Sequence, residues 1–287
     1  GLGDEATAVL RSVDELVPVV LYVDESYVGV SKEIHRKHVE NCLSADAIVA
    51  NSAAVKKRLE SITEMPPIRM IEPAVQPYAP AQRQVIRHAI SNAHSILRIQ
   101  NEQPLAISIC QFGDDCGLVE IIEAWPKVIE DHPDAKLWLV GEGPCADQIW
   151  QRIVDLGLSY SVLLPGYFDA LNDLFSAADL YIHTGGTTQS GDGLVRASLT
   201  GIRSVAIRNW VTEDLSERNP RFSVTLTERT KLAESVSHAF NQAVQNLDNR
   251  NPGPQNHSQA KLSCRRQIED YLKLLEIHHR QITRLTH

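Results

Sequence analysis

The protein has 287 residues, 43% of them hydrophobic, and a formal net charge of −8 at pH 7. This length exceeds one ordinary compact domain and suits two, so we expect two domains that share a ligand cleft. The negative charge and the scattered Lys and Arg residues argue against nucleic acid or an anionic membrane as the main partner. The five cysteines are dispersed without a CxxC pair, so the sequence indicates neither a disulfide framework nor a zinc site. We therefore expect a reduced, cytoplasmic setting, and no apolar run is long enough for a transmembrane segment.

The first part of the chain has the pattern of an incomplete α/β domain. Apolar runs predict strands at residues 17–24, 45–52 and 68–75, with a helix at 53–62 between the second and third. Three strands are too few to bury a good sheet alone. We therefore predict a partial N-terminal α/β domain over residues 1–76.

From residue 104 onwards, apolar runs of strand length alternate with segments whose apolar residues recur at helical spacing. The predicted strands cover residues 105–112, 136–141, 161–166, 179–186 and 204–207. Alternating helices and continuously apolar strands are typical of a parallel sheet covered on both faces. We predict a doubly wound, Rossmann-like domain over residues 77–247, with a further amphipathic helix from Leu232. Residues 248–287 are predicted to form a polar linker and a final helix that packs back towards the N-terminal part.

Residues 184–198, TGGTTQSGDGLVRAS, place four glycines just before a predicted helix. Glycines at a helix N-terminus let backbone N–H groups and the positive helix end meet an anion, so this loop is a candidate phosphate site. Its spacing fits neither GxxxxGK[ST] nor GxGxxG. The alternative is a turn-rich loop whose glycines only supply positive φ angles. The missing GxGxxG also makes a nicotinamide-dependent dehydrogenase the weakest of the functional alternatives.

Several stretches in their order and spacing resemble the group 1 retaining glycosyltransferases, a GT4-like family with the GT-B fold. They are ADAIVANSAAVKKRL, IRMIEPAVQPYAP, CGLVEIIEAWPKVIEDHPDAKLWLVGEGP, VLLPGYFDALNDLFSAADLYI and LVRASLTGIRSVA. The first strands of that family, with their glycine-rich loop, have no counterpart here. The resemblance implies a nucleotide-sugar donor bound to the C-terminal domain near an interdomain cleft, without a metal cofactor.

Four charged positions of the family's donor site differ in this sequence. The resemblance places an Arg and a Lys, which neutralise the donor diphosphate, at Gln111 and Cys116, and two glutamates at Thr188 and Arg196. Each lost cation removes a charge-assisted contact worth roughly 1.5–3 kcal/mol. Arg196 has only donors and cannot replace a ribose acceptor, but it could bind a phosphate.

Other nucleotide-binding candidates follow the predicted strands. They are Gly141, Glu142, Gly143, Gly166, Tyr167, Phe168 and Gly191, together with Arg196. The resemblance implies that the loops at 141–144 and 166–168 contact the nucleotide base through main-chain groups. The alternative is that they are ordinary turns at a sheet edge.

The remaining candidates are weaker. His35 and His38 lack a third ligand, so surface histidines are favoured over a metal site. His183 and Asp24 end strands and could face the cleft, but each could equally have a structural role. The spacing of Trp125, Trp138 and Trp150 predicts core packing.

The sequence therefore predicts a glycosyltransferase-like protein, related to enzymes that transfer sugar from a nucleotide-sugar donor in polysaccharide or glycoconjugate synthesis. The alternative is a catalytically inactive GT-B descendant that binds a nucleotide or a protein partner. An active enzyme would need other residues, such as Arg196, Arg203 or Arg208, to balance the diphosphate charge. Our expectation is that transfer is slow.

Overall fold

The computed structural model describes residues 19–23, 39–62, 64–71, 82–185, 191–218, 223–245 and 265–273. Asp24, His35, His38 and Thr188 lie outside the described residues, as does the predicted linker. The chain divides into two compact units. Unit 1 comprises Gly1–Gln76 and Ser258–His287, and unit 2 comprises Pro77–His257.

Unit 1 contains a three-stranded parallel sheet in the order β1-β2-β3. Its elements are β1 (Val20–Val23), β2 (Ala47–Ala50), α4 (Ala53–Glu60) and β3 (Ile68–Met70). Helix α4 begins where the Ser52 side chain accepts a hydrogen bond from the Val55 N–H group at 3.3 Å, as expected of an N-cap residue.

Residues 265–273 of unit 1 are helical. Tyr271 of this segment packs against a buried cluster of Ala47, Val49 and Ile71, which Val20 also contacts. Since Val20, Ala47 and Val49 share one face of the sheet by register, this segment contributes to covering that face.

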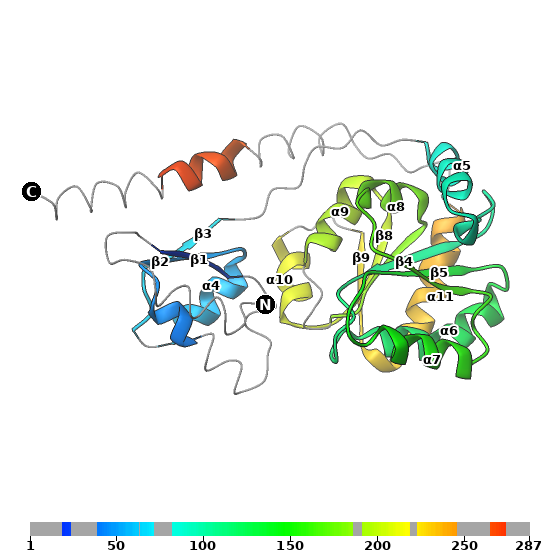
Figure 1. Cartoon of the computed structure of the whole chain (residues 1–287), viewed down its shortest axis with the longest axis horizontal. Helices are drawn as coiled ribbons and strands as arrows, with labels where there is room; N and C mark the ends of the chain where they lie inside the picture. The colour runs from blue at the N-terminus through cyan, green and yellow to red at the C-terminus, as the bar shows by residue number, and fades with distance from the viewer. Residues whose placement is uncertain are drawn as a thin grey trace, which may run out of the picture. The chain divides into compact units, whose positions relative to one another are not determined.

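Unit 2 is built on a six-stranded sheet in the order β6-β5-β4-β7-β8-β9 (Figure 1). Its strands are β4 (Leu105–Ile109), β5 (Lys136–Val140), β6 (Val162–Gly166), β7 (Leu180–His183), β8 (Arg203–Ile207) and β9 (Val224–Thr227). Its α-helices are α5 (Arg83–Ala93), α6 (Leu118–Asp131), α7 (Ala146–Asp155), α8 (Leu171–Ala177), α9 (Asp192–Thr200), α10 (Trp210–Arg218) and α11 (Leu232–Gln245). All the strand pairs are parallel, which confirms the predicted doubly wound fold.

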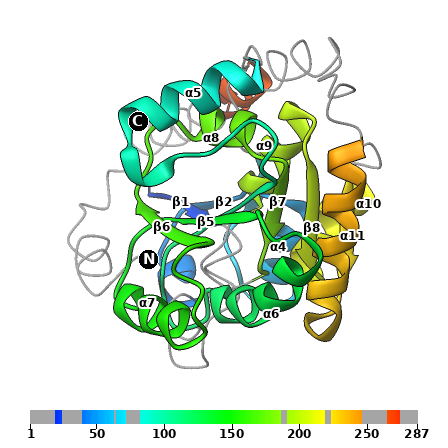
Figure 2. The same cartoon turned by 90° about the vertical axis from the view of Figure 1, so that its right-hand side faces the viewer.

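The sheet of unit 2 has a hydrophobic core on each face. Helices α6, α7 and α11 cover one face, and α5, α8 and α9 cover the other (Figure 2). Trp125 and Trp138 are fully buried, as predicted. Trp150 is not: it is 45% exposed, because its neighbours Ile149 and Ile153 occupy the buried side of α7.

Three elements of unit 2 were not predicted, namely α5, α10 and β9. Helix α5 is held by the fully buried Arg87, whose guanidinium donates to Asp179 Oδ2 at 2.8 Å and to the Ala177 carbonyl at 2.8 Å. The same group also donates to the carbonyl oxygens of Gln100, Asn101 and Gln103. One buried cation thus ties α5 and the following segment to the end of α8.

Candidate functional site

The strand order of unit 2 reverses between β4 and β7, since β5 and β6 follow on one side of β4 and β8 and β9 on the other. Parallel α/β sheets bind ligands beyond the carboxyl ends of their strands at such a reversal. The segments there are residues 110–117 after β4 and residues 184–191 after β7, the second described only at its two ends. These two segments flank the candidate site.

The two segments contact each other directly. The buried hydroxyl of Thr184 donates to the Cys116 carbonyl oxygen at 2.6 Å. Gly117 follows with a φ of 70°, and a Cβ atom at this position would lie 2.6 Å from the Cβ of Thr184. Glycine is therefore required where the two segments meet.

The loop after β4 is also joined to the loop after β5. The Phe112 N–H donates to the Glu142 carbonyl at 2.9 Å, and the Cys145 N–H donates to the Phe112 carbonyl at 3.0 Å. A Cβ atom on Gly141 would lie 1.9 Å from the Cys110 carbonyl oxygen, and one on Gly143 would lie 2.4 Å from that of Phe112. These two glycines permit close approach of two backbones. This packing requirement alone explains why glycine occupies both positions at this edge of the sheet.

We expect Gly141→Ala to destabilise the protein by roughly 2–5 kcal/mol. About 1–3 kcal/mol comes from its φ of 142°, which residues with a Cβ rarely adopt, and the rest from the clash with the Cys110 carbonyl. Gly157→Ala is the matched control, because Gly157 also has a positive φ of 67° but has no atom within 4 Å of the added Cβ. Urea denaturation followed by circular dichroism measures both changes, and equal losses would refute the close-packing explanation.

The loop after β6 lies beside the loop after β5. The Gly141 N–H donates to the Gly166 carbonyl at 3.0 Å, and a Cβ atom on Gly166 would lie 3.6 Å from Glu142 Oε1. Tyr167 is 69% exposed at this edge. Phe168 instead packs against the core and meets the His94 ring at a centroid distance of 5.4 Å. Of these candidates, Glu142 and Tyr167 present their side chains to solvent.

The glycines around the segment after β7 also have packing roles. Gly185, with a φ of 69°, accepts a hydrogen bond from Asn209 Nδ2 at 3.0 Å through its carbonyl. Gly191 precedes α9, and a Cβ atom there would lie 2.6 Å from Leu215 Cδ1. His183 is buried at the end of β7, and its Nδ1 accepts from the Gly185 N–H at 3.0 Å. This contact fits the structural alternative for His183.

The arginines that could balance a diphosphate lie in different places. Arg196 on α9 donates to the neutral amide oxygen of Asn172 at 3.2 Å. Arg208 follows β8 at the carboxyl edge, but Glu213 lies 3.0 Å and Glu228 3.2 Å from its guanidinium. Arg203 begins β8 and is therefore at the opposite edge of the sheet, so it cannot serve this site.

The loop that should hold the diphosphate is acidic. Gln111 is exposed and neutral, Cys116 is buried, and Asp114 and Asp115 between them are exposed. Two carboxylates therefore stand on the loop where the family pattern has two cations. A diphosphate bound beside this loop would be repelled rather than neutralised.

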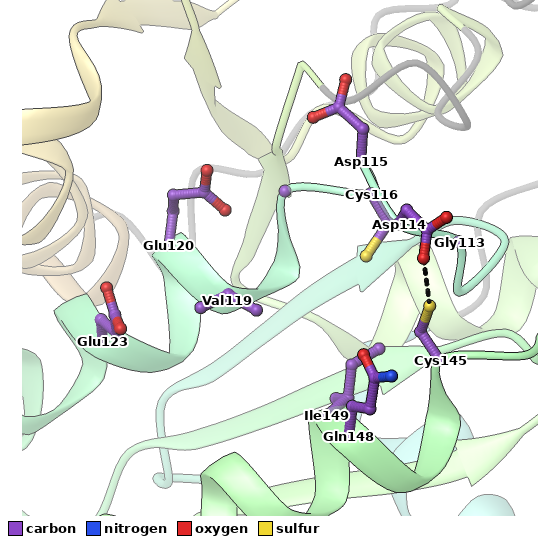
Figure 3. Close-up of a pocket in the computed structure, with 11 residues that line it drawn as sticks. Gly113, Asp114, Asp115, Cys116, Val119, Glu120, Glu123, Cys145, Gln148 and Ile149 are labelled. Atoms are coloured by element: carbon purple, nitrogen blue, oxygen red, sulfur yellow. Dashed lines mark hydrogen bonds between the residues drawn. The ribbon is translucent and has the colours of Figure 1, made fainter.

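A pocket of about 300 Å³ lies at the N-termini of α6 and α7 (Figure 3). It is lined by Gly113, Asp114, Asp115, Cys116, Gly117, Val119, Glu120, Glu123, Cys145, Gln148 and Ile149. The Cys145 thiol donates to Asp114 Oδ1 at 3.3 Å, and this bond raises the pKa of Cys145. The sequence did not predict this pocket.

Cys116 has the opposite environment. The neighbouring Cys110 thiol and the Leu118 N–H group favour its thiolate form and lower the pKa of Cys116 to about 6. The same contact and burial raise the pKa of Cys110.

Over the described ranges, no cluster of three or more His, Cys, Asp or Glu side chains has the arrangement of a metal site. In the same part of the chain, no helix has the length and apolarity needed to cross a bilayer.

Comparisons with known proteins extend these observations. Residues 90–195 match the family model described as "Glycosyl transferases group 1". Over 90 residues the chain is 30% identical to poly(glycerol-phosphate) alpha-glucosyltransferase of Bacillus subtilis (strain 168), covering 31% of this chain and 13% of that protein. Over 166 residues it is 24% identical to the lipopolysaccharide core biosynthesis glycosyltransferase LpsE of Rhizobium meliloti (strain 1021), covering 58% of this chain and 45% of LpsE. The chain thus spans less than half the length of either relative.

The fold is also found in solved structures. Anabaena Alr3699/HepE in complex with UDP and glucose superposes with a TM-score of 0.68 at 19% identity, over 93% of this chain and 73% of that one. Unit 2 is a parallel α/β unit whose strand order reverses between β4 and β7. Together with this structural similarity, the strand reversal shows that the chain has the GT-B fold of glycosyltransferases. Over part of its length, the chain is therefore similar to the group 1 glycosyl transferases.

Proposed function

We propose that unit 2 binds the nucleotide of a nucleotide-sugar donor at the carboxyl edge of its sheet, and that the whole protein transfers the sugar to a polysaccharide or glycoconjugate acceptor. The observation that carries this proposal is the strand reversal between β4 and β7, where the Thr184 and Cys116 segments meet. The relatives support the reaction class, since HepE was solved with UDP and glucose.

The two sides of the proposed site have different roles. The loops after β5 and β6 offer backbone groups, the Glu142 carboxylate and the exposed Tyr167 ring, all of which suit a nucleoside. An aromatic ring can stack on a base, and a carboxylate can accept its N–H groups. On the other side, the N-terminus of α9 and Arg196 are the groups that favour an anion. Phosphate binding would therefore depend on α9 rather than on the acidic loop after β4.

Measuring which class of nucleotide binds to the protein tests this proposal. A thermal-shift and calorimetry panel of UDP, GDP and ADP, their sugar conjugates and NAD should show stabilisation by one class of nucleoside diphosphate and none by NAD. Absence of binding to every nucleotide would refute the proposed function.

Tyr167→Ala should weaken binding of the selected nucleotide by about 3- to 10-fold, the loss expected for one stacked ring. Tyr160→Ala is the matched control. Tyr160 is also exposed, at 58%, but precedes β6 and therefore lies at the amino edge of the sheet. Calorimetric titration of both variants measures the effect, and equal weakening would contradict the assignment of the base to the carboxyl edge.

We further propose that donor binding requires no metal ion and that the protein works in the cytoplasm. The buried thiols of Cys110, Cys116 and Cys145 are not part of disulfides, which supports a reducing compartment. A protein partner is a secondary proposal, which size-exclusion chromatography with light scattering on cell extracts and purified protein would test. Binding of the nucleotide in the presence of EDTA would test metal independence.

A further inference from the structure

We propose that Asn209 is a positioning residue for the phosphate side of the nucleotide site, because its amide holds both ends of the segment between β7 and α9. The inference rests on the proposed function, which places the phosphates at the N-terminus of α9. Asn209 lies between β8 and α10, at the carboxyl edge of the sheet. Its side chain joins α10 to Gly185 near the start of that segment.

Gly185 is held through both of its backbone polar groups. Its N–H donates to His183 Nδ1 at 3.0 Å, and its carbonyl oxygen accepts from Asn209 Nδ2 at 3.0 Å. The residue has a φ of 69°, and a Cβ atom there would lie 2.9 Å from Asn209 Nδ2 and 3.1 Å from the Ile207 carbonyl oxygen. The left-handed conformation, glycine and the Asn209 amide therefore act together to fix the direction in which the chain leaves β7.

Gly191, at the other end of the segment, lies against α10. A Cβ atom on Gly191 would lie 2.6 Å from Leu215 Cδ1 and 3.8 Å from Val211 Cγ1. Asn209 Oδ1 accepts from the Val211 N–H at 2.9 Å and from the Thr212 N–H at 2.8 Å, which are the contacts of a helix cap. The amide that holds Gly185 through its nitrogen thus orders, through its oxygen, the turn of α10 that packs beside the start of α9.

The alternative is that Asn209 only caps α10, and side-chain chemistry separates the two roles. A cap needs an acceptor, which Ser and Asp supply about as well as Asn. The contact with the Gly185 carbonyl needs a donor. A carboxylate has none, and a serine hydroxyl ends one bond nearer the backbone than Asn209 Nδ2 does. Asn209→Ser and Asn209→Asp therefore keep the cap and remove the hold on Gly185, and only the second adds a charge.

Titration with two ligands tests the positioning role. The ligands are the nucleoside diphosphate that the wild type prefers, measured by calorimetry, and the matching nucleoside, measured by ligand-observed NMR. Asn209→Ser should weaken diphosphate binding by about 3- to 10-fold, the worth of one hydrogen bond, and Asn209→Asp by at least as much. Nucleoside binding should not change, because the base is assigned to the loops after β5 and β6. Asn241→Ser and Asn241→Asp make the same changes on the exposed surface of α11 and should affect neither ligand.

The possible results separate this inference from the proposed function. Weakening by Asn209→Asp alone would show that added charge, and not the lost donor, is responsible. Equal losses for the diphosphate and the nucleoside would show a general structural role. Either result would overturn the inference, as would unchanged diphosphate binding in Asn209→Ser. A wild type that binds no nucleotide would instead refute the proposed function and this inference together.

A double-mutant cycle tests the contact between Asn209 and Gly185 itself. Gly185→Ala should weaken diphosphate binding, because the added Cβ meets Asn209 Nδ2. Asn209→Ser removes that nitrogen, so the loss in the double variant should be smaller than the product of the two single losses. Single losses that multiply in full would show that the two residues act independently and would contradict the proposed hold.

Discussion

Replacing Asp179 with Ala is expected to lower the free energy of unfolding by about 3–5 kcal/mol, the cost of leaving a buried charge without its partner. Asp179 is buried between α8 and β7, where Oδ2 accepts from Arg87 at 2.8 Å and from the Leu105 N–H at 2.8 Å. Oδ1 lies 2.9 Å from Arg83 Nε. The alanine variant leaves the Arg87 guanidinium charged and fully buried, and a buried, uncompensated charge is more costly than an exposed one.

Urea denaturation of Asp179→Ala and of a surface control measures this difference. Glu123→Ala removes an ion pair with Arg152 whose side chains are 49% and 40% exposed, so it should cost no more than about 1 kcal/mol. If the two variants lose similar stability, the Asp179 network does not hold α5 to the sheet in the way the structure indicates.

The same network shows why sequence patterns missed α5. The predicted strands of unit 2 could be recognised because each is a continuous apolar run, as in β5. Such a run can be read from the residues of the strand alone. Helix α5, by contrast, buries an arginine, and the residue that makes this burial tolerable lies 92 positions away. A local pattern assigns Arg87 to a solvent-exposed face, since only the fold brings Asp179 to it.

The candidate site was predictable in position but not in chemistry. Parallel strands made it certain that the loops after β4 and β5 would meet at one edge, and the comparison with the family pattern located the missing charges at Gln111 and Cys116. The reason for Gly141 became visible only with the Cys110 carbonyl 1.9 Å from its added Cβ.

Sugar transfer by this chain should be at least about 100-fold slower than is typical of group 1 glycosyltransferases. Losing one electrostatic contact to a developing charge costs roughly 100- to 1,000-fold in other enzymes. Here, the loop after β4 carries Asp114 and Asp115 but no cation. Radiolabelled nucleotide sugars, incubated with this chain and with a version extended at the N-terminus, measure the rate. Transfer at a typical rate that Arg196→Ala abolishes would show that the site has been rebuilt around α9.

Restoring one cation tests the same electrostatic argument in the opposite direction. Gln111→Arg should tighten binding of a nucleoside diphosphate by about 10-fold, because a charge-assisted contact is worth roughly 1.5–3 kcal/mol and the nearby carboxylates offset part of it. Gln111 is exposed, so the change costs little stability.

Gln151→Arg adds the same charge on the exposed surface of α7 and is the matched control. Because long-range attraction is screened by salt and a direct phosphate contact much less so, the gain at position 111 should persist at 0.15 M ionic strength, where a gain at position 151 should disappear. Equal tightening by both variants would mean that net charge, and not the position after β4, governs phosphate binding.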